Sequence, residues 1–179
     1  ELFLIVSTGR RLVQVLEGQG DLASVTGLTY RVRGEVVSNA DRELIPDLDS
    51  LPFPARQHFD LNRYGLRTPE GQPMVTILSS RGCPYNCSYC FKGIVGRTYR
   101  HRSPQNIVAE IKQVIGQTGI HSYYFIDDLF TADVKRLQEL MELMIAEELN
   151  IRWQCLGRVD RISPEILKSW LFVDSIFRR

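Results

Sequence analysis

The residues Cys83-Pro84-Tyr85-Asn86-Cys87-Ser88-Tyr89-Cys90 decide how the rest of this sequence is interpreted. They follow the apolar run Met74-Val75-Thr76-Ile77-Leu78 and space three cysteines as C-x3-C-x2-C. Thiolates this close on one turn cannot all pair as disulfides, and an odd number of them suits a metal ion or an iron–sulfur cluster. A closed structural zinc site takes four nitrogen or sulfur ligands, whereas a cluster held by three thiolates leaves one iron open to a small molecule.

The spacing C-x3-C-x-aromatic-C, with Tyr89 as the aromatic residue, resembles the cluster loop of the radical S-adenosylmethionine (SAM) superfamily. Its position after an apolar strand is also similar to that family. Three further segments resemble the subgroup whose full-length members carry an N-terminal cobalamin-binding domain, namely LDSLPFPAR (48–56), FIDDLFT (125–131) and GRVD (157–160). The resemblance covers nearly the whole chain.

This resemblance implies a cofactor set and a reaction class. Cys83, Cys87 and Cys90 would hold three irons of a [4Fe-4S] cluster, and SAM would chelate the fourth. An electron from the cluster, supplied by a flavodoxin or ferredoxin, would cleave SAM to a 5′-deoxyadenosyl radical that attacks an unactivated carbon. We expect a small or lipid-like substrate and either methyl transfer or a ring-forming or oxidative rearrangement. Cobalamin is implied by the same kinship for the full-length protein.

Composition excludes several classes of protein. The chain has 179 residues, 44% hydrophobic and 24% charged, which is ordinary for a globular protein with a proper core. A net charge of +1 gives no reason to expect bulk attraction to nucleic acid or to an acidic membrane. No apolar run is long enough for a membrane span, and four cysteines without a disulfide pattern favour the reducing cytoplasm. Because the first residue is not methionine, we expect a fragment of a longer protein.

Three regions are expected along the chain. Residues 1–27 are interpreted as the tail of a truncated cobalamin-binding-like domain of Rossmann-like fold, because 2–16 has a roughly helical apolar period. Residues 28–70 are interpreted as a hairpin and a proline-rich linker, and 71–179 as the N-terminal half of a radical SAM barrel. The cobalamin motif Asp-x-His-x-x-Gly is absent from the sequence, since no histidine stands in it.

The middle region contains two local signals. Residues 28–33 and 36–38 flank Gly34-Glu35, which predicts a short β-hairpin with a tight glycine turn. Three prolines in 46–54 then predict an extended surface segment. This segment is either an interdomain linker or part of the interface between a cobalamin domain and the barrel.

From Pro73 onward the pattern is strand, loop and helix, repeated. Strands are expected at 75–78, 123–126 and 151–156, and helices after Ser103-Pro104, after Thr131 as N-cap with Asp133 in the first turn, and after Ser163-Pro164. The second helix should face the core with the apolar residues Leu137, Leu140, Met141, Met144 and Ile145. The predicted fold class is α/β, a partial parallel (β/α) barrel made of its first three βα units.

Chemistry in parallel βα folds is located at the carboxyl ends of the strands. Asp127 and Asp128 lie at such an end and are candidates for binding the ammonium group of SAM, although paired acids also cap helices. Arg158 could bind a carboxylate of SAM or substrate, or form an internal salt bridge with Asp160 or Asp174. The resemblance implies that Tyr89 packs between the cluster and the adenine.

Two alternative functions remain open from the sequence. The cysteines could form a zinc-stabilised interaction module completed by His101 or Cys155, although Cys155 is otherwise expected to be a small buried side chain. The basic stretch 97–102 (RTYRHR) could contact RNA, as in a radical SAM methylthiotransferase that acts on tRNA, or could be a solvated or acid-paired loop.

Overall fold

The structure is a computed structural model that describes residues 9–91, 93, 96–164 and 167. The chain divides into two compact units, Glu1–Ile45 and Pro46–Arg179. Within the described residues no helix combines the length and the apolar character needed to cross a membrane.

The first unit is a helix followed by a hairpin. It contains helix α1 (Gly9–Leu16), the 3₁₀ helix η2 (Leu22–Ser24) and strands β1 (Thr29–Val32) and β2 (Glu35–Ser38). A small core is formed by the buried side chains of Leu12, Val25, Leu28 and Tyr30. The Asn39 amide ties the end of β2 to η2, because its Nδ2 donates to the carbonyls of Leu22 (2.7 Å) and Val25 (2.8 Å).

The hairpin is present, but its turn lies one residue earlier than the sequence predicted. Val32 pairs with Glu35, so Arg33 and Gly34 form the two-residue turn. Both have positive φ angles, 50° and 92°. A type I′ turn requires this at both positions, and its twist matches that of the flanking strands. The turn geometry therefore places Glu35 in the strand.

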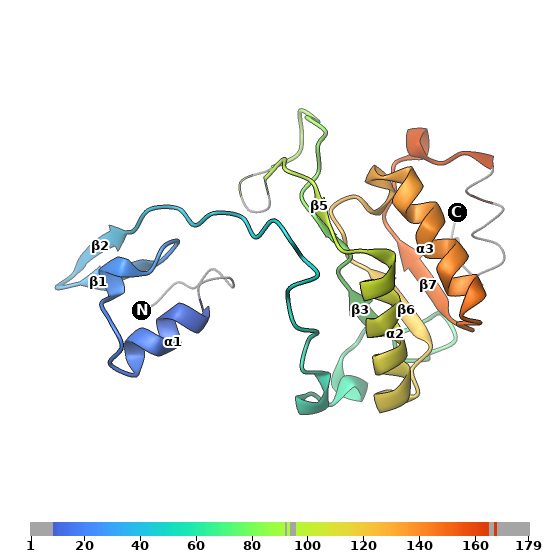
Figure 1. Cartoon of the computed structure of the whole chain (residues 1–179), viewed down its shortest axis with the longest axis horizontal. Helices are drawn as coiled ribbons and strands as arrows, with labels where there is room; N and C mark the ends of the chain where they lie inside the picture. Colours follow the sequence, from blue (N-terminus) through green and yellow to red (C-terminus); the bar gives the residue numbers. More distant parts are fainter. Residues whose placement is uncertain (1–8, 92, 94–95, 165–166, 168–179) are drawn as a thin grey trace. The chain divides into compact units, whose positions relative to one another are not determined.

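The second unit is built on a parallel sheet with the strand order β3 (Val75–Ile77), β6 (Ser122–Phe125), β7 (Arg152–Cys155). Helices α2 (Pro104–Thr118) and α3 (Val134–Ala146) connect these strands and pack together over the sheet (Figure 1). Ile77 pairs with Phe125, and Phe125 with Cys155, so the three strands end level with one another. The predicted partial parallel barrel is confirmed for its strands and its first two helices.

Helix α2 begins where the sequence predicted and continues through Gly116 to its C-cap at Gly119. The hydroxyl of Ser103 accepts a hydrogen bond from the Asn106 amide (3.1 Å), and Pro104 occupies the first helical position. Gly119 ends the helix in the left-handed conformation, with φ 66°. Both ends follow local rules, since serine is a preferred N-cap and glycine adopts positive φ without a steric cost.

Helix α3 corrects two predictions. Its N-cap is Asp133, whose Oδ1 accepts from the Arg136 amide (3.1 Å), whereas Thr131 is buried in the 3₁₀ helix η5 (Phe130–Ala132). Ile145 was expected to face the core but is 44% exposed, because it lies in the last turn. The other four apolar residues predicted on this face are buried. The third helix, expected after Ser163, lies mostly outside the described residues.

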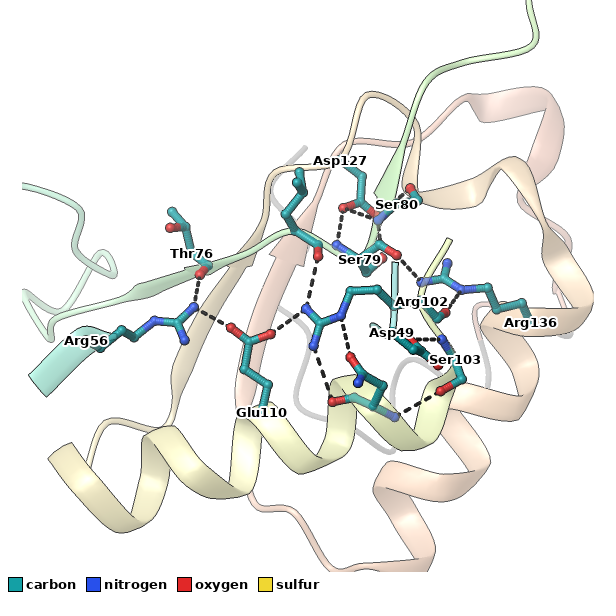
Figure 2. Close-up of polar contacts among 12 residues, drawn as sticks. Asp49, Arg56, Thr76, Ser79, Ser80, Arg102, Ser103, Glu110, Asp127 and Arg136 are labelled. Atoms are coloured by element: carbon teal, nitrogen blue, oxygen red, sulfur yellow. Dashed lines mark hydrogen bonds and ion pairs between the residues drawn. The ribbon is translucent and has the colours of Figure 1, made fainter. Parts of the chain in front are cut away.

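Residues 48–56, which we call the strap, are tied to the barrel by a buried ionic network (Figure 2). Arg56 donates to Glu110 (2.6 Å) and to the Thr76 carbonyl (3.0 Å). Glu110 lies on α2, is only 1% exposed and also binds Arg102. The Oδ1 atom of Asp49 accepts from the Ser103 amide (2.9 Å). These contacts join the strap to β3 and α2, and the sequence did not predict them.

Glu110→Ala should therefore destabilise the fold strongly. The variant leaves the Arg56 and Arg102 guanidinium groups buried without their shared carboxylate. Removing one partner of a buried ion pair typically lowers the free energy of unfolding by about 3–5 kcal/mol. The measurement is the free energy of unfolding in urea. Glu147→Ala is the matched control, because Glu147 pairs with Lys112 at the surface and exposed pairs contribute at most about 1 kcal/mol. Equal effects of the two substitutions would contradict the role given to Glu110.

Candidate functional site

The cysteine loop leaves the carboxyl end of β3 through a short antiparallel pair. Strand β4 (Ser80–Arg81) pairs with β5 (Arg100–His101), so the chain between them forms a closed loop. At the start of that loop Gly82 has φ +80°, and a Cβ at this position would lie 2.3 Å from the Thr98 carbonyl oxygen. Only glycine fits there, and Cys83 follows it directly.

The three loop cysteines differ in burial. Cys83 is buried, Cys87 is half-buried and Cys90 is exposed, and all are free thiols. The Cys90 amide donates to the Cys87 carbonyl (3.1 Å), which forms a tight turn between the last two cysteines. Tyr89 projects into solvent at 91% exposure. In the described part of the chain, no three or more His, Cys, Asp or Glu side chains are gathered as a metal-binding group.

The donor set nevertheless fits an iron–sulfur cluster. Three thiols stand on one loop, none is used in a disulfide, and thiolates are the usual ligands of iron–sulfur clusters. The first cysteine is held by the fold, while the other two lie on the accessible part of the loop. This loop is where the sequence predicted the cofactor ligands.

The carboxylate of Asp127, a candidate for binding the ammonium group of SAM, is bound by other residues of the chain. The residue is 2% exposed, and its two carboxylate oxygens accept hydrogen bonds from the amides and hydroxyls of Ser79 and Ser80 (Figure 2). A carboxylate has about four acceptor sites, so four donors saturate it. Asp128 is exposed, and its Oδ2 accepts from the Gly82 amide (2.9 Å). Of the two acids, only Asp128 is accessible to a ligand.

Arg158 lies against the cysteine loop. Its Nη1 is 3.5 Å from the Cys87 sulfur, and its guanidinium carbon is 4.1 Å from the centre of the Tyr85 ring. The same guanidinium binds Asp160 through two hydrogen bonds of 3.0 and 2.9 Å. Hydrogen bonding to Arg158 lowers the pKa of the Asp160 carboxyl, which keeps the pair charged. The salt bridge with Asp160 predicted as an alternative is therefore present, and it holds the cation beside a candidate cluster ligand.

Two residues to which the sequence analysis gave no role in the site position Arg158. The buried hydroxyl of Thr131 accepts from the Arg158 amide (3.2 Å). A Cβ on Gly157 would approach the Thr131 methyl group to 2.8 Å, so glycine allows the close contact. The threonine expected as a helix cap instead joins the loop after β6 to the loop after β7.

The basic stretch 97–102 is largely used inside the molecule. Arg102 is buried and binds Glu110, and Arg97 donates to the side chain of Asn86 (2.6 Å). Tyr99 is partly buried, which raises its pKa, and its hydroxyl lies 3.4 Å from the Arg136 guanidinium. This geometry does not support the RNA-contact interpretation.

The residues proposed to complete a zinc site have other surroundings. The His101 ring contacts the Arg102 carbonyl (3.2 Å) and approaches Asp133 (4.0 Å). Cys155 packs against the apolar core, and burial raises the pKa of its thiol to about 12. The simpler interpretation of Cys155, a small buried side chain, fits these facts.

A cleft of about 810 Å³ lies at the opposite end of the strands. Its lining includes Pro73 before β3, His121 and Ser122 at the start of β6, and Ile151 and Arg152 at the start of β7. Barrel enzymes carry their chemistry at the carboxyl ends of the strands, so the cysteine loop is the candidate site.

A parallel βα fold with three cysteines on the loop after its first strand is typical of a protein that binds an iron–sulfur cluster. The family model described as the radical SAM superfamily matches residues 77–173, which is more than half of the chain. The chain therefore belongs to the radical SAM superfamily, whose members use a [4Fe-4S] cluster and SAM. This membership favours the iron–sulfur interpretation of the three cysteines over the zinc-module alternative.

Three comparisons describe its relatives. The chain is 29% identical over 163 residues to an uncharacterized methyltransferase, PH0819, of Pyrococcus horikoshii, covering 90% of this chain and 35% of that protein. It is 31% identical over 148 residues to an anaerobic magnesium-protoporphyrin IX monomethyl ester cyclase of Cereibacter sphaeroides, covering 80% and 24%. The fold is similar to that of the cobalamin-dependent SAM radical enzyme OxsB, with a TM-score of 0.72 and 21% identity over 93% of this chain and 25% of that one. The chain thus spans about a third or less of the length of the relatives it matches.

Thiol chemistry of the iron-free chain should distinguish Cys90 from Cys155. At about pH 9, iodoacetamide should modify exposed Cys90 well before half-buried Cys155, because the thiolate is the nucleophile and a pKa of about 12 keeps Cys155 protonated. Mass spectrometry of a labelling time course measures the order. Urea-unfolded chain is the control and should lose the difference. Equal labelling of Cys90 and Cys155 in the folded chain would contradict the placement of Cys155.

Proposed function

We propose that this chain is part of a radical SAM enzyme that acts on an unactivated carbon of a small or lipid-like substrate, with methyl transfer as the leading reaction. The observation that carries the proposal is the set of three free thiols on the loop after the first parallel strand, inside the region that matches the family. Because the chain spans only part of its relatives, substrate and reaction are properties of the whole protein.

Cys83, Cys87 and Cys90 are the proposed ligands of the [4Fe-4S] cluster. These residues would hold the cluster, and the chemistry it would supply when bound is the one electron that cleaves a C–S bond of SAM to give methionine and a 5′-deoxyadenosyl radical. The protein contributes position and shielding. Cys87 and Cys90 lie on the accessible part of the loop and must approach buried Cys83 when the three bind one cluster.

SAM contacts are proposed for three accessible side chains around this loop. Arg158 is already beside Cys87 and is suited to the carboxylate of SAM, since a guanidinium binds carboxylates in a bidentate manner. The exposed carboxylate of Asp128 is suited to the ammonium group. Tyr89 is solvent-exposed in the ligand-free chain and is proposed to cover the adenine.

Methyl transfer is favoured by the similarity to the Pyrococcus horikoshii methyltransferase, which extends over 90% of this chain. Cyclisation is the second candidate, because the Cereibacter sphaeroides cyclase has the slightly higher identity, 31%. The similarity in fold to a cobalamin-dependent enzyme supports cobalamin as a cofactor of the whole protein. A tRNA substrate is disfavoured because the basic stretch is largely occupied by internal contacts.

A small reductant protein such as a flavodoxin or ferredoxin is the proposed electron source. A cytoplasmic location is proposed with it, because free cysteines and a reduced cluster require a reducing compartment.

Anaerobic reconstitution tests the cluster assignment. The chain should bind iron and sulfide in equal amounts, and the electron paramagnetic resonance (EPR) signal of the reduced sample should change on addition of SAM. Cys87→Ala should lose the signal because it removes one ligand. Cys155→Ala is the matched control and should keep the signal, since Cys155 lies in the core. Bound zinc without sulfide, or equal loss in both variants, would reject the proposal.

Arg158→Gln should weaken SAM binding to the reconstituted chain by about tenfold, because a charge-assisted hydrogen bond to the carboxylate is lost. Isothermal titration calorimetry measures the dissociation constant. Arg161→Gln is the control, because Arg161 lies near the same Tyr85 ring, at 5.9 Å, without a contact to a loop cysteine among those described. Unchanged SAM affinity in Arg158→Gln would remove this residue from the site.

A further inference from the structure

We propose that Asp127 and Arg136 are positioning residues that fix the path from Ser79 to Cys83 and so hold the first cluster ligand in place before the cluster binds. The inference rests on the proposed function, since it concerns assembly of the same site. It gives Asp127 a role different from the SAM contact that the sequence suggested.

Asp127, which follows β6, binds the backbone and side chains of Ser79 and Ser80. Its Oδ1 accepts from the amides of Ser79 (2.6 Å) and Ser80 (3.1 Å). Its Oδ2 accepts from the Ser80 hydroxyl (2.9 Å) and from the Ser79 hydroxyl. Hydrogen bonds to an ionised carboxylate are stronger than neutral ones, and those of a buried group do not compete with water. The carboxylate is therefore fully used in holding two consecutive residues.

Arg136, which lies on α3, binds the backbone of Ser79. The side chain is 3% exposed, and its Nη2 donates to the Ser79 carbonyl (2.9 Å). Its Nε donates to the Arg102 carbonyl (2.9 Å), at the end of the returning strand β5. The Ser79 carbonyl also accepts from the Arg102 amide (2.9 Å). Ser79 is thus held at its amide, hydroxyl and carbonyl by two buried side chains of opposite charge, as Figure 2 shows.

The fixed path continues as far as Cys83. Asp128 accepts from the Gly82 amide, and the backbone of Gly82 packs directly against Thr98. Cys83 is then 6% exposed, in contrast to exposed Cys90. Because ordering a chain segment costs conformational entropy, a ligand that is already ordered reduces the cost of binding the cluster. The geometry supports a loop in which Cys83 is already in position before the cluster binds, while Cys87 and Cys90 move to bind it.

The first experiment is hydrogen–deuterium exchange on the iron-free 179-residue chain, comparing wild type with Asp127→Asn. The variant keeps the side-chain shape but replaces one acceptor oxygen with an amide donor facing the serine hydroxyls. We expect faster exchange of the amides in 79–83 with an unchanged circular dichroism spectrum. Tyr123→Phe removes a buried hydroxyl that donates to the Ile120 carbonyl (2.9 Å) before β6, away from Ser79, and is the control, expected not to speed exchange in 79–83.

The second experiment is iron and sulfide retention after anaerobic reconstitution of the same variants. Loss of a residue that orients a metal ligand typically weakens metal binding by about tenfold or more, which is the loss expected for Asp127→Asn. Ser80→Ala removes one hydroxyl donor and should give a smaller loss, which keeps the test valid if Asp127→Asn does not fold. Tyr123→Phe should retain the cluster with a wild-type EPR signal.

Different outcomes separate the two proposals. Normal cluster loading in Asp127→Asn combined with lost SAM binding would overturn the positioning role and return Asp127 to SAM. Equal losses of iron in Asp127→Asn and Tyr123→Phe would also overturn it, because the effect would then be general destabilisation. If wild type binds no cluster while Asp127→Asn still loosens 79–83, the proposed function fails but the hold on Ser79 and Ser80 stands.

Discussion

The parallel pairing of β3, β6 and β7 is the constraint on which the candidate site depends. Since these strands end level with one another, the loops that follow them meet at one edge of the sheet. The first loop carries the cysteines, the second carries Asp127 and Asp128, and the third carries Arg158. Direct contacts join them, from Asp127 to Ser79 and from Arg158 to Cys87. Residues far apart in the sequence therefore form one site.

Buried charge holds this arrangement together. Glu110 joins the strap to α2 through Arg56 and Arg102, and Asp127 and Arg136 bind the start of the cysteine loop. Buried ion pairs add little net stability compared with apolar packing, because desolvation offsets their attraction. They are directional, however, and they restrict the backbone to one path. We infer that these buried polar contacts serve mainly to position the cysteine loop.

Sequence signals were sufficient where the physical cause is local. The three strands of the parallel sheet, helices α2 and α3 and the caps of α2 follow from apolar periodicity and from Ser103, Pro104 and Gly119. The partners of Asp127 and Thr131 could not be predicted, because they lie in segments distant in the sequence and are set by tertiary packing. One usable signal was missed. Glu110 and Arg136 each interrupt the apolar face of a helix, and a charge at such a position indicates a buried ionic partner.

The central claim is that three cysteines of this loop leave one iron of a cluster open to SAM. Electron–nuclear double resonance on the reduced, reconstituted chain tests it most directly, with SAM that carries an isotopic label at its amino nitrogen. A hyperfine coupling between the labelled nitrogen and the cluster spin is expected. A cluster that forms normally but shows no such coupling at saturating SAM would contradict it.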